Sequence, residues 1–138
     1  VKMLWYPVRD GDPRAVALYR RHYSCRDPKV DLCRYGFSGK GESMVLLTLD
    51  CLALFCWRLV KGEGVNCSVF HNESSLLSSE LVKEADELAY VRWPGERHYT
   101  YVNSKKIRST NPGACFMFAG WRKCGVSKGG LIILEKCY

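Results

Sequence analysis

Two neighbouring segments, Met44–Thr48 and Leu52–Trp57, are almost wholly apolar and are separated only by a tight turn at Leu49-Asp50. Apolar segments of about four to eight residues between turn residues are typical of buried strands, because each is too short for a helix of ordinary length. We therefore expect these segments to form a hairpin at the centre of a sheet.

Helical and strand patterns alternate along the rest of the chain. The predicted helices cover residues 14–23, 78–91 and 112–118; the other predicted strands cover 65–71 and 98–103, and a final hairpin joins 121–126 to 129–136. Strands that alternate with helices around an apolar sheet predict an α/β fold. No linker or repeat divides the chain, so residues 1–138 are expected to form a single domain.

Capping residues mark the ends of the predicted helices. Asp12 and Asn111 are expected N-caps, each followed by a proline, and Ser78 is expected to cap the second helix. The spacing of that helix gives it an apolar stripe of Leu77, Leu81, Ala85 and Leu88, with Lys83, Glu84, Asp86 and Glu87 facing water. Residues 26–42 are rich in glycine and charge and are expected to form a long loop.

The charge is unevenly distributed. Residues 1–41 hold nine Lys/Arg and four Asp/Glu, residues 42–96 hold four and nine, and residues 97–138 hold eight and one. If the two basic ends meet in the fold, they form a positive surface that suits a polyanion such as DNA. A solvated face without a partner would have the same composition.

The eight cysteines include no Cys-x-x-Cys pair, and those at 51, 56, 67 and 115 have apolar neighbours. This pattern is typical of buried thiols in a reducing compartment rather than of zinc ligands, so no metal site is assigned. The chain has neither a signal-peptide pattern nor an apolar run of about 18 residues. We therefore expect a cytoplasmic protein that does not enter the membrane.

The segment from Tyr101-Val102-Asn103 through Asn111-Pro112-Gly113 to Gly120-Trp121 resembles the GNAT acyltransferase superfamily, with its strand, Asn, aromatic-bearing helix and Gly-Phe before a last hairpin. Trp121 stands where the family has Phe. The likeness covers residues 44–136 and implies a mixed central sheet flanked by helices. It also implies that the strand–helix unit 65–91 binds the donor, with Ser78, Ser79 and Phe116 as donor contacts.

GNAT enzymes usually carry a glycine-containing loop at the start of the central helix, where backbone N–H groups hold the pyrophosphate of coenzyme A. The corresponding stretch here, 71–79, contains no glycine, and Glu73 would repel a pyrophosphate. The identity of the donor is therefore left open, and the sequence argues against acetyl-CoA.

The segment Tyr19-Arg20-Arg21-His22-Tyr23-Ser24 is similar to the His-Tyr-Ser segment of phage Mom-type DNA modification proteins, which are GNAT-like and add a carbamoylmethyl group to adenine N6. His22 is the candidate acid–base group, because the ordinary pKa of histidine lies near neutral pH, and Tyr23 is expected to donate a proton or stack a base. Asn103 stands where relatives have Asp and is expected to orient a donor carbonyl. Packing or capping roles remain alternatives for His22.

Modification of a base in duplex DNA requires its extrusion, and aromatic side chains then hold it. Tyr99 and Tyr101 share a strand face and are expected in this cleft, although packing against a helix would explain them equally well. The expected phosphate contacts are Arg21, Arg26, Lys105, Lys106, Arg108 and Lys128. Two alternatives remain, a conventional N-acetyltransferase and a non-enzymatic nucleic-acid-binding protein, and a homodimer is also left open.

Overall fold

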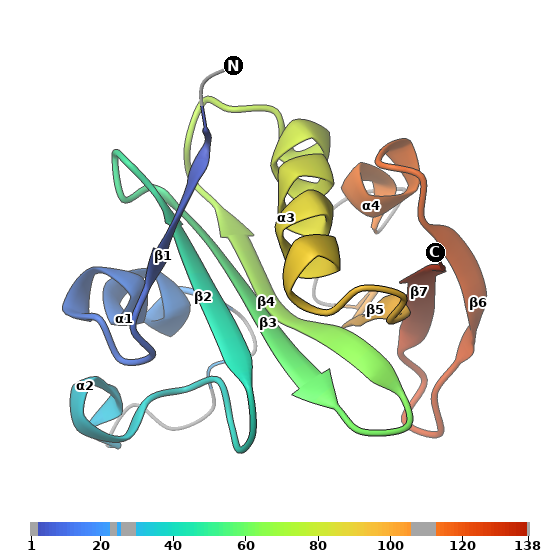
Figure 1. Cartoon of the computed structure of the whole chain (residues 1–138), viewed down its shortest axis with the longest axis horizontal. Coiled ribbons are helices and arrows are strands. Elements are labelled where there is room, and N and C mark those ends of the chain that lie inside the picture. The colour runs from blue at the N-terminus through green and yellow to red at the C-terminus, as the bar shows by residue number, and fades with distance from the viewer. Residues whose placement is uncertain (1–2, 23–24, 26–29, 106–112, 138) are drawn as a thin grey trace.

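A computed structural model describes residues 3–22, 25, 30–105 and 113–137 of the chain. Its centre is one seven-stranded sheet with the strand order β1-β2-β3-β4-β5-β7-β6 (Figure 1). The strands are β1 Trp5–Val8, β2 Ser43–Thr48, β3 Ala53–Val60, β4 Gly64–Asn72, β5 His98–Val102, β6 Arg122–Val126 and β7 Ile132–Lys136. All neighbours are antiparallel except β4 and β5, so the sheet is mixed and the protein is α/β, as the sequence predicted.

The predicted central hairpin is confirmed. β2 and β3 pair in antiparallel register, and their apolar side chains are buried on both faces of the sheet. The strand β1 was not predicted, because the four residues Trp5-Tyr6-Pro7-Val8 contain a proline and show no alternation. Pro7 is tolerated there because β1 lies at the edge of the sheet, where one side of the strand needs no hydrogen-bond donors.

The helices are α1 Pro13–Arg20, α2 Leu32–Tyr35, α3 Ser78–Arg92 and α4 Ala114–Phe118. Asp12 caps α1 through its side chain and Pro13 occupies the first turn, as predicted, although α1 ends before the predicted Tyr23. α2 lies within the predicted loop, where Asp31 caps a single short turn. Gly113 is the N-cap of α4, so the prediction of a cap at Asn111, which lies outside the described residues, was wrong.

α3 agrees with the predicted helix in extent but not in four details. Leu77, predicted in the apolar stripe, is 67% exposed, and Glu84, predicted to face water, is half-buried and accepts hydrogen bonds from the N–H groups of Leu4 and Trp5. Ser78 is not its N-cap, because Leu77 occupies that position and makes no side-chain cap. Asp86 does not face water, because it shares the buried side of α3 with Val82 and Ala89. Helical positions 82, 86 and 89 lie on one side, so the carboxylate enters the core with the neighbouring apolar groups.

Two apolar clusters lie on opposite faces of the sheet. On one face, α3 and α4 pack over Phe55, Trp57 and Leu134. On the other face, Ala15 and Leu18 of α1 pack over β2, β3 and β4 in a cluster that includes Leu54, Cys56 and Val69. Figure 1 shows α1 and α2 grouped near β1 and β2, whereas α4 lies near β6. The sheet is therefore the middle layer of a three-layer arrangement.

Two irregularities in the sheet shape its centre. Trp57 pairs with Cys67 but Cys56 pairs with Val69, so Ser68 is an extra residue that bulges from β4. The parallel pairing of β4 with β5 covers only Val65–Cys67 and His98–Thr100. Beyond that point the two strands run on without a shared register, to Asn72 in β4 and to Val102 in β5.

Two of the four cysteines expected in apolar surroundings, Cys56 and Cys67, are buried, and burial raises the pKa of the Cys56 thiol to about 12. Cys51 and Cys115 are half-buried. None of the described helices has the length and apolar character that crossing a bilayer requires.

Candidate active site

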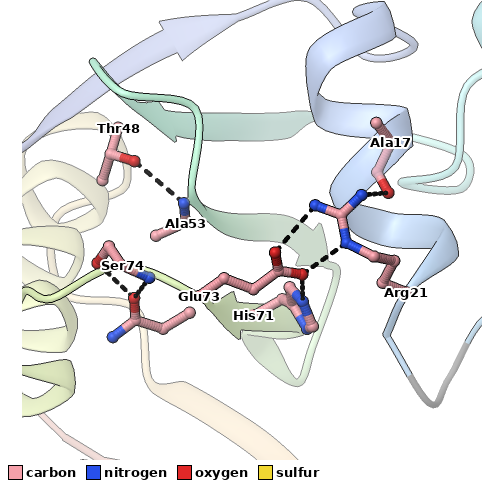
Figure 2. A network of polar contacts seen from close by, with 8 residues as sticks. Ala17, Arg21, Thr48, Ala53, His71, Glu73 and Ser74 are labelled. Atoms are coloured by element: carbon pink, nitrogen blue, oxygen red, sulfur yellow. Dashed lines mark hydrogen bonds and ion pairs between the residues drawn. The ribbon is translucent and has the colours of Figure 1, made fainter.

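Arg21, His71 and Glu73 form a hydrogen-bonded cluster between the end of α1 and the end of β4, which we call the Arg21–Glu73–His71 cluster (Figure 2). The Arg21 guanidinium donates to both Glu73 oxygens, from Nε to Oε2 at 2.7 Å and from Nη2 to Oε1 at 3.0 Å. Nε2 of His71 lies 2.6 Å from Oε2 of Glu73. A third Arg21 nitrogen donates to the carbonyl of Ala17, one turn back on α1.

The bulge at Ser68 explains why His71 faces α1. Val65 and Cys67, before the bulge, belong to the apolar cluster under α3. Val69, after it, belongs to the cluster under α1, and His71 lies two residues further on the same face. Without the extra residue, the alternation that begins at Val65 would turn His71 toward α3. The irregularity in β4 therefore brings His71 and Arg21 to one side of the sheet.

Charge pairing determines the protonation state of Glu73. The hydrogen bonds from Arg21, and then the one from His71, lower the pKa of this carboxyl to about 2, so it is ionised at neutral pH. An ionised carboxylate only accepts hydrogen bonds, so Nε2 of His71 carries the hydrogen that joins them. In the neutral ring, Nδ1 is then the nitrogen that can accept a proton.

His22 lies against this cluster, with its ring centroid 5.7 Å from that of His71 and the two rings nearly perpendicular. Burial, and then the nearby His71, lower the pKa of His22 to about 4. His22 is therefore neutral at physiological pH, and its side chain is a poor proton acceptor there. His22, the predicted acid–base residue, therefore lies at the cluster, but the histidine that contacts the Glu73 carboxylate is His71.

An open hollow of about 560 Å³ lies beside the N-terminus of α3. It is lined by Asn72, Ser74, Ser75, Leu76, Leu77, Ser78, Ser79, Ala114, Cys115 and Phe118. The predicted donor contacts Ser78 and Ser79 thus lie in this hollow. Phe116 does not join them, because it is buried and packs edge-on against Phe70 and beside Trp121.

Side chains of the loop itself accept from two of its backbone N–H groups. The Asn72 side chain accepts from the N–H of Ser74 and donates to the Ser78 hydroxyl, and the N–H of Leu76 donates to the Ser74 hydroxyl. The N–H of Glu73 donates to the carbonyl of Leu52. A coenzyme A pyrophosphate is held by such groups, so the N–H groups of Ser74 and Leu76 are already engaged and cannot also hold it.

Asn103 directly follows β5. In the same way, His71 and Glu73 lie at the end of β4, the strand that pairs in parallel with β5. Both predicted site residues, His22 and Asn103, thus lie near the carboxyl ends of the two central parallel strands, which no longer pair there. The side chain of Asn103 accepts from the N–H of Lys105 at 3.1 Å.

The residues predicted to contact nucleic acid differ in their surroundings. Tyr101 is 43% exposed, whereas Tyr99 is buried at 2% and its hydroxyl donates to Glu63. Lys105 and Lys128 are exposed. The guanidinium of Arg21, expected at a phosphate, is instead bound to Glu73. Tyr23, Arg26, Lys106 and Arg108 lie outside the described residues.

Sequence reasoning missed the two residues that carry the cluster. His71 and Glu73 are two positions apart at the end of a strand, a spacing that puts both side chains on one face, and this is the one local signal. Within the described residues, no group of three or more His, Cys, Asp or Glu side chains could hold a metal ion. A comparison with protein-family models gives no match, and a comparison with curated proteins gives none.

Proposed function

We propose that this protein is a GNAT-like transferase of the Mom type, which adds an acyl or carbamoylmethyl group to the exocyclic amine of a DNA base, adenine N6. The observation that carries the proposal is the contact of 2.6 Å between His71 and an ionised Glu73 at the end of β4. A histidine held by a carboxylate is a typical general base for proton removal from a nucleophile.

The arrangement of the elements supports the GNAT part of the proposal. β5 leads through Asn103 to α4, which carries Phe116, and Gly120-Trp121 then leads to the hairpin of β6 and β7. This is the order that the resemblance implies. The strand–helix unit β4–α3 lies beside the serine-lined hollow, where the donor would bind.

The proposed transfer follows from the roles of these groups. The amine nitrogen attacks the donor carbon and forms the new bond, while the bond from that carbon to the leaving group breaks and the leaving group takes its electron pair. Nδ1 of His71 accepts the proton that the amine loses. Glu73 stabilises the resulting imidazolium, and Arg21 holds Glu73 in place with two hydrogen bonds.

The remaining residues position the reactants. The carboxamide of Asn103 can orient a donor carbonyl, because it offers two N–H groups and cannot ionise. Serine hydroxyls of the hollow can donate to oxygen atoms of the donor. No step is assigned to coenzyme A, because the loop lacks the family's glycine and the N–H groups of Ser74 and Leu76 are already bonded within it.

The experiment is mass spectrometry of nucleosides from the DNA of cells that express the protein. We expect a new modified deoxyadenosine with wild type, its loss with His71→Asn, and its retention with Lys83→Ala, an exposed control on α3. An unchanged nucleoside profile with wild-type protein would contradict the proposal. Modification that survives His71→Asn would remove His71 from the chemistry.

The same samples separate the two alternatives. A conventional N-acetyltransferase would leave the nucleosides unchanged and bind acetyl-CoA measurably in calorimetry. A non-enzymatic binding protein would leave them unchanged and bind DNA with a steep dependence on salt.

A further inference from the structure

Among the described residues, helices cover only part of the sheet face that carries α1. The buried contacts of α1 are with residues of β2, β3 and β4. Figure 1 shows α1 and α2 on the side of β1 and β2, apart from β6 and β7. The part of this face that β5, β7 and β6 form is therefore outside the helix-packed core.

A column of side chains runs along β5 on this uncovered part. The Arg97 guanidinium lies over the ring of Tyr99, with its carbon 4.6 Å from the ring centroid. The ring of Tyr99 meets that of Tyr101 edge to face, with centroids 5.8 Å apart and an angle of 85°. Tyr99 is held by its hydrogen bond to Glu63, so the exposed ring of Tyr101 stands on a fixed support.

Cations lie at both ends of this column. Arg97 and Arg122 share the carboxylate of Glu135, at 2.6 Å and 2.8 Å, and the carboxylate of Glu63 at the Tyr99 hydroxyl balances the second arginine, so two lysines supply the excess positive charge. Lys105 follows β5 and Lys128 lies in the turn between β6 and β7. Because Val102 pairs with Ile132, both lysines lie beyond the Tyr101 end of the strands.

We propose that this face, which we call the Tyr101 platform, binds single-stranded nucleic acid by stacking an unpaired base on the Tyr101 ring. An exposed aromatic ring among cations is the arrangement that holds single strands, because every base has a face that can stack and a phosphate that a cation can contact. Bases inside a duplex are already stacked and offer only their edges. The inference rests on the proposed function only in taking a nucleic acid as partner.

The test is fluorescence anisotropy with a short labelled oligonucleotide, as single-stranded DNA, as single-stranded RNA and as a DNA duplex of equal length, without any donor. We expect the single strands to bind more tightly than the duplex. Tyr101→Ala should weaken single-strand binding by about 5- to 100-fold, the usual cost of losing one stacked base. Tyr101→Phe keeps the ring and should bind as wild type does.

Tyr90→Ala is the matched control, because Tyr90 is 44% exposed but lies on α3, on the opposite face. It should bind as wild type does, and circular dichroism should show that every variant is folded. Equal affinity for duplex and single strand, wild-type binding by Tyr101→Ala, an equal loss with Tyr90→Ala, or no binding at all would each overturn the inference. Wild-type protein that binds single strands but yields no modified nucleoside in expressing cells would contradict the proposed function and leave the platform standing.

Discussion

Nδ1 of His98 lies 2.8 Å from Oδ1 of Asp86, and neither side chain is more than 1% exposed. The other carboxylate oxygen accepts from the indole N–H of Trp121 at 2.9 Å, and the Lys136 ammonium lies 3.7 Å from it. Both side-chain oxygens of Asp86 are therefore engaged, as those of buried polar side chains usually are. One side chain thus joins α3 to β5, to the residue before β6, and to β7.

Replacement of Asp86 by alanine should destabilise the fold strongly. It leaves His98 and the Trp121 N–H without this acceptor in the core, and each buried polar group that loses its partner costs about 1–3 kcal/mol. Denaturant unfolding measures this loss. Glu87→Ala is the control, because Glu87 is the next residue on α3 but is exposed, and its effect should stay within about 0.5 kcal/mol. Equal stability of the two variants would contradict the role given to Asp86.

The local sequence pattern was sufficient to predict most strands of the sheet. It was insufficient to predict which polar side chains are buried and hydrogen-bonded to one another. The short apolar segments around Leu46 and Phe55 are buried most readily as central strands of a sheet, so β2 and β3 could be predicted. The burial of Asp86 could not, because its partners Trp121 and His98 are distant in sequence and a lone carboxylate on a helix usually faces water.

The candidate site shows the same limit. His22 could be named from a local segment, but its neighbour His71 comes from β4 and its orientation depends on the bulge at Ser68. Nothing in the sequence marks Ser68 as an extra residue. Arg21 and Glu73 come from two different elements, so the sequence did not indicate that they pair. From the sequence, Glu73 could be described only as a negative charge that would repel a pyrophosphate.

His22 should make the protein less stable as the pH falls from about 6.5 to about 4. The folded state binds its proton only below a pKa of about 4, whereas the unfolded chain binds it below the ordinary value of 6.5. Acid therefore favours the unfolded chain across this window, by up to about 3 kcal/mol, and the loss is complete below it. Thermal or urea unfolding as a function of pH measures this, and His22→Gln should flatten the curve between these pH values.

Glu73 should act in a separate and more acidic window. Its pKa is lowered from 4.5 to about 2, so its ion pair stabilises the fold above pH 4.5, and the contribution is lost as the pH falls through about 2. Glu73→Gln should remove part of the stability loss seen at acidic pH. The part due to Asp12, whose pKa is also about 2, should remain. If Glu73→Gln changes only the region near pH 6, the assignment of the two windows is wrong.

The rate of base modification should depend more on His71 than on His22. Loss of a general base usually costs about 10²- to 10⁴-fold, so His71→Asn should reduce the accumulation of modified deoxyadenosine by that amount. His22→Gln should reduce it much less, because a pKa lowered to about 4 makes His22 a weak proton acceptor. Glu73→Gln should lower the rate, because the imidazolium that forms on His71 then loses the carboxylate that stabilises it. A larger loss with His22→Gln than with His71→Asn would reverse the assignment.

Gly64 should be the glycine of the β3–β4 turn that tolerates no side chain. Its φ is +125°, and a Cβ there would collide with the backbone carbonyl of Arg97, which accepts from the N–H of Val65 at 2.7 Å. Gly64→Ala should therefore separate the start of β4 from β5 and cost more than about 2 kcal/mol of unfolding free energy. Gly62 in the same turn also has a positive φ, of +81°, but nothing lies within 4 Å of its Cβ position. Gly62→Ala should then cost only the backbone strain, about 1 kcal/mol, and equal losses in the two variants would show that strain rather than the contact with Arg97 decides.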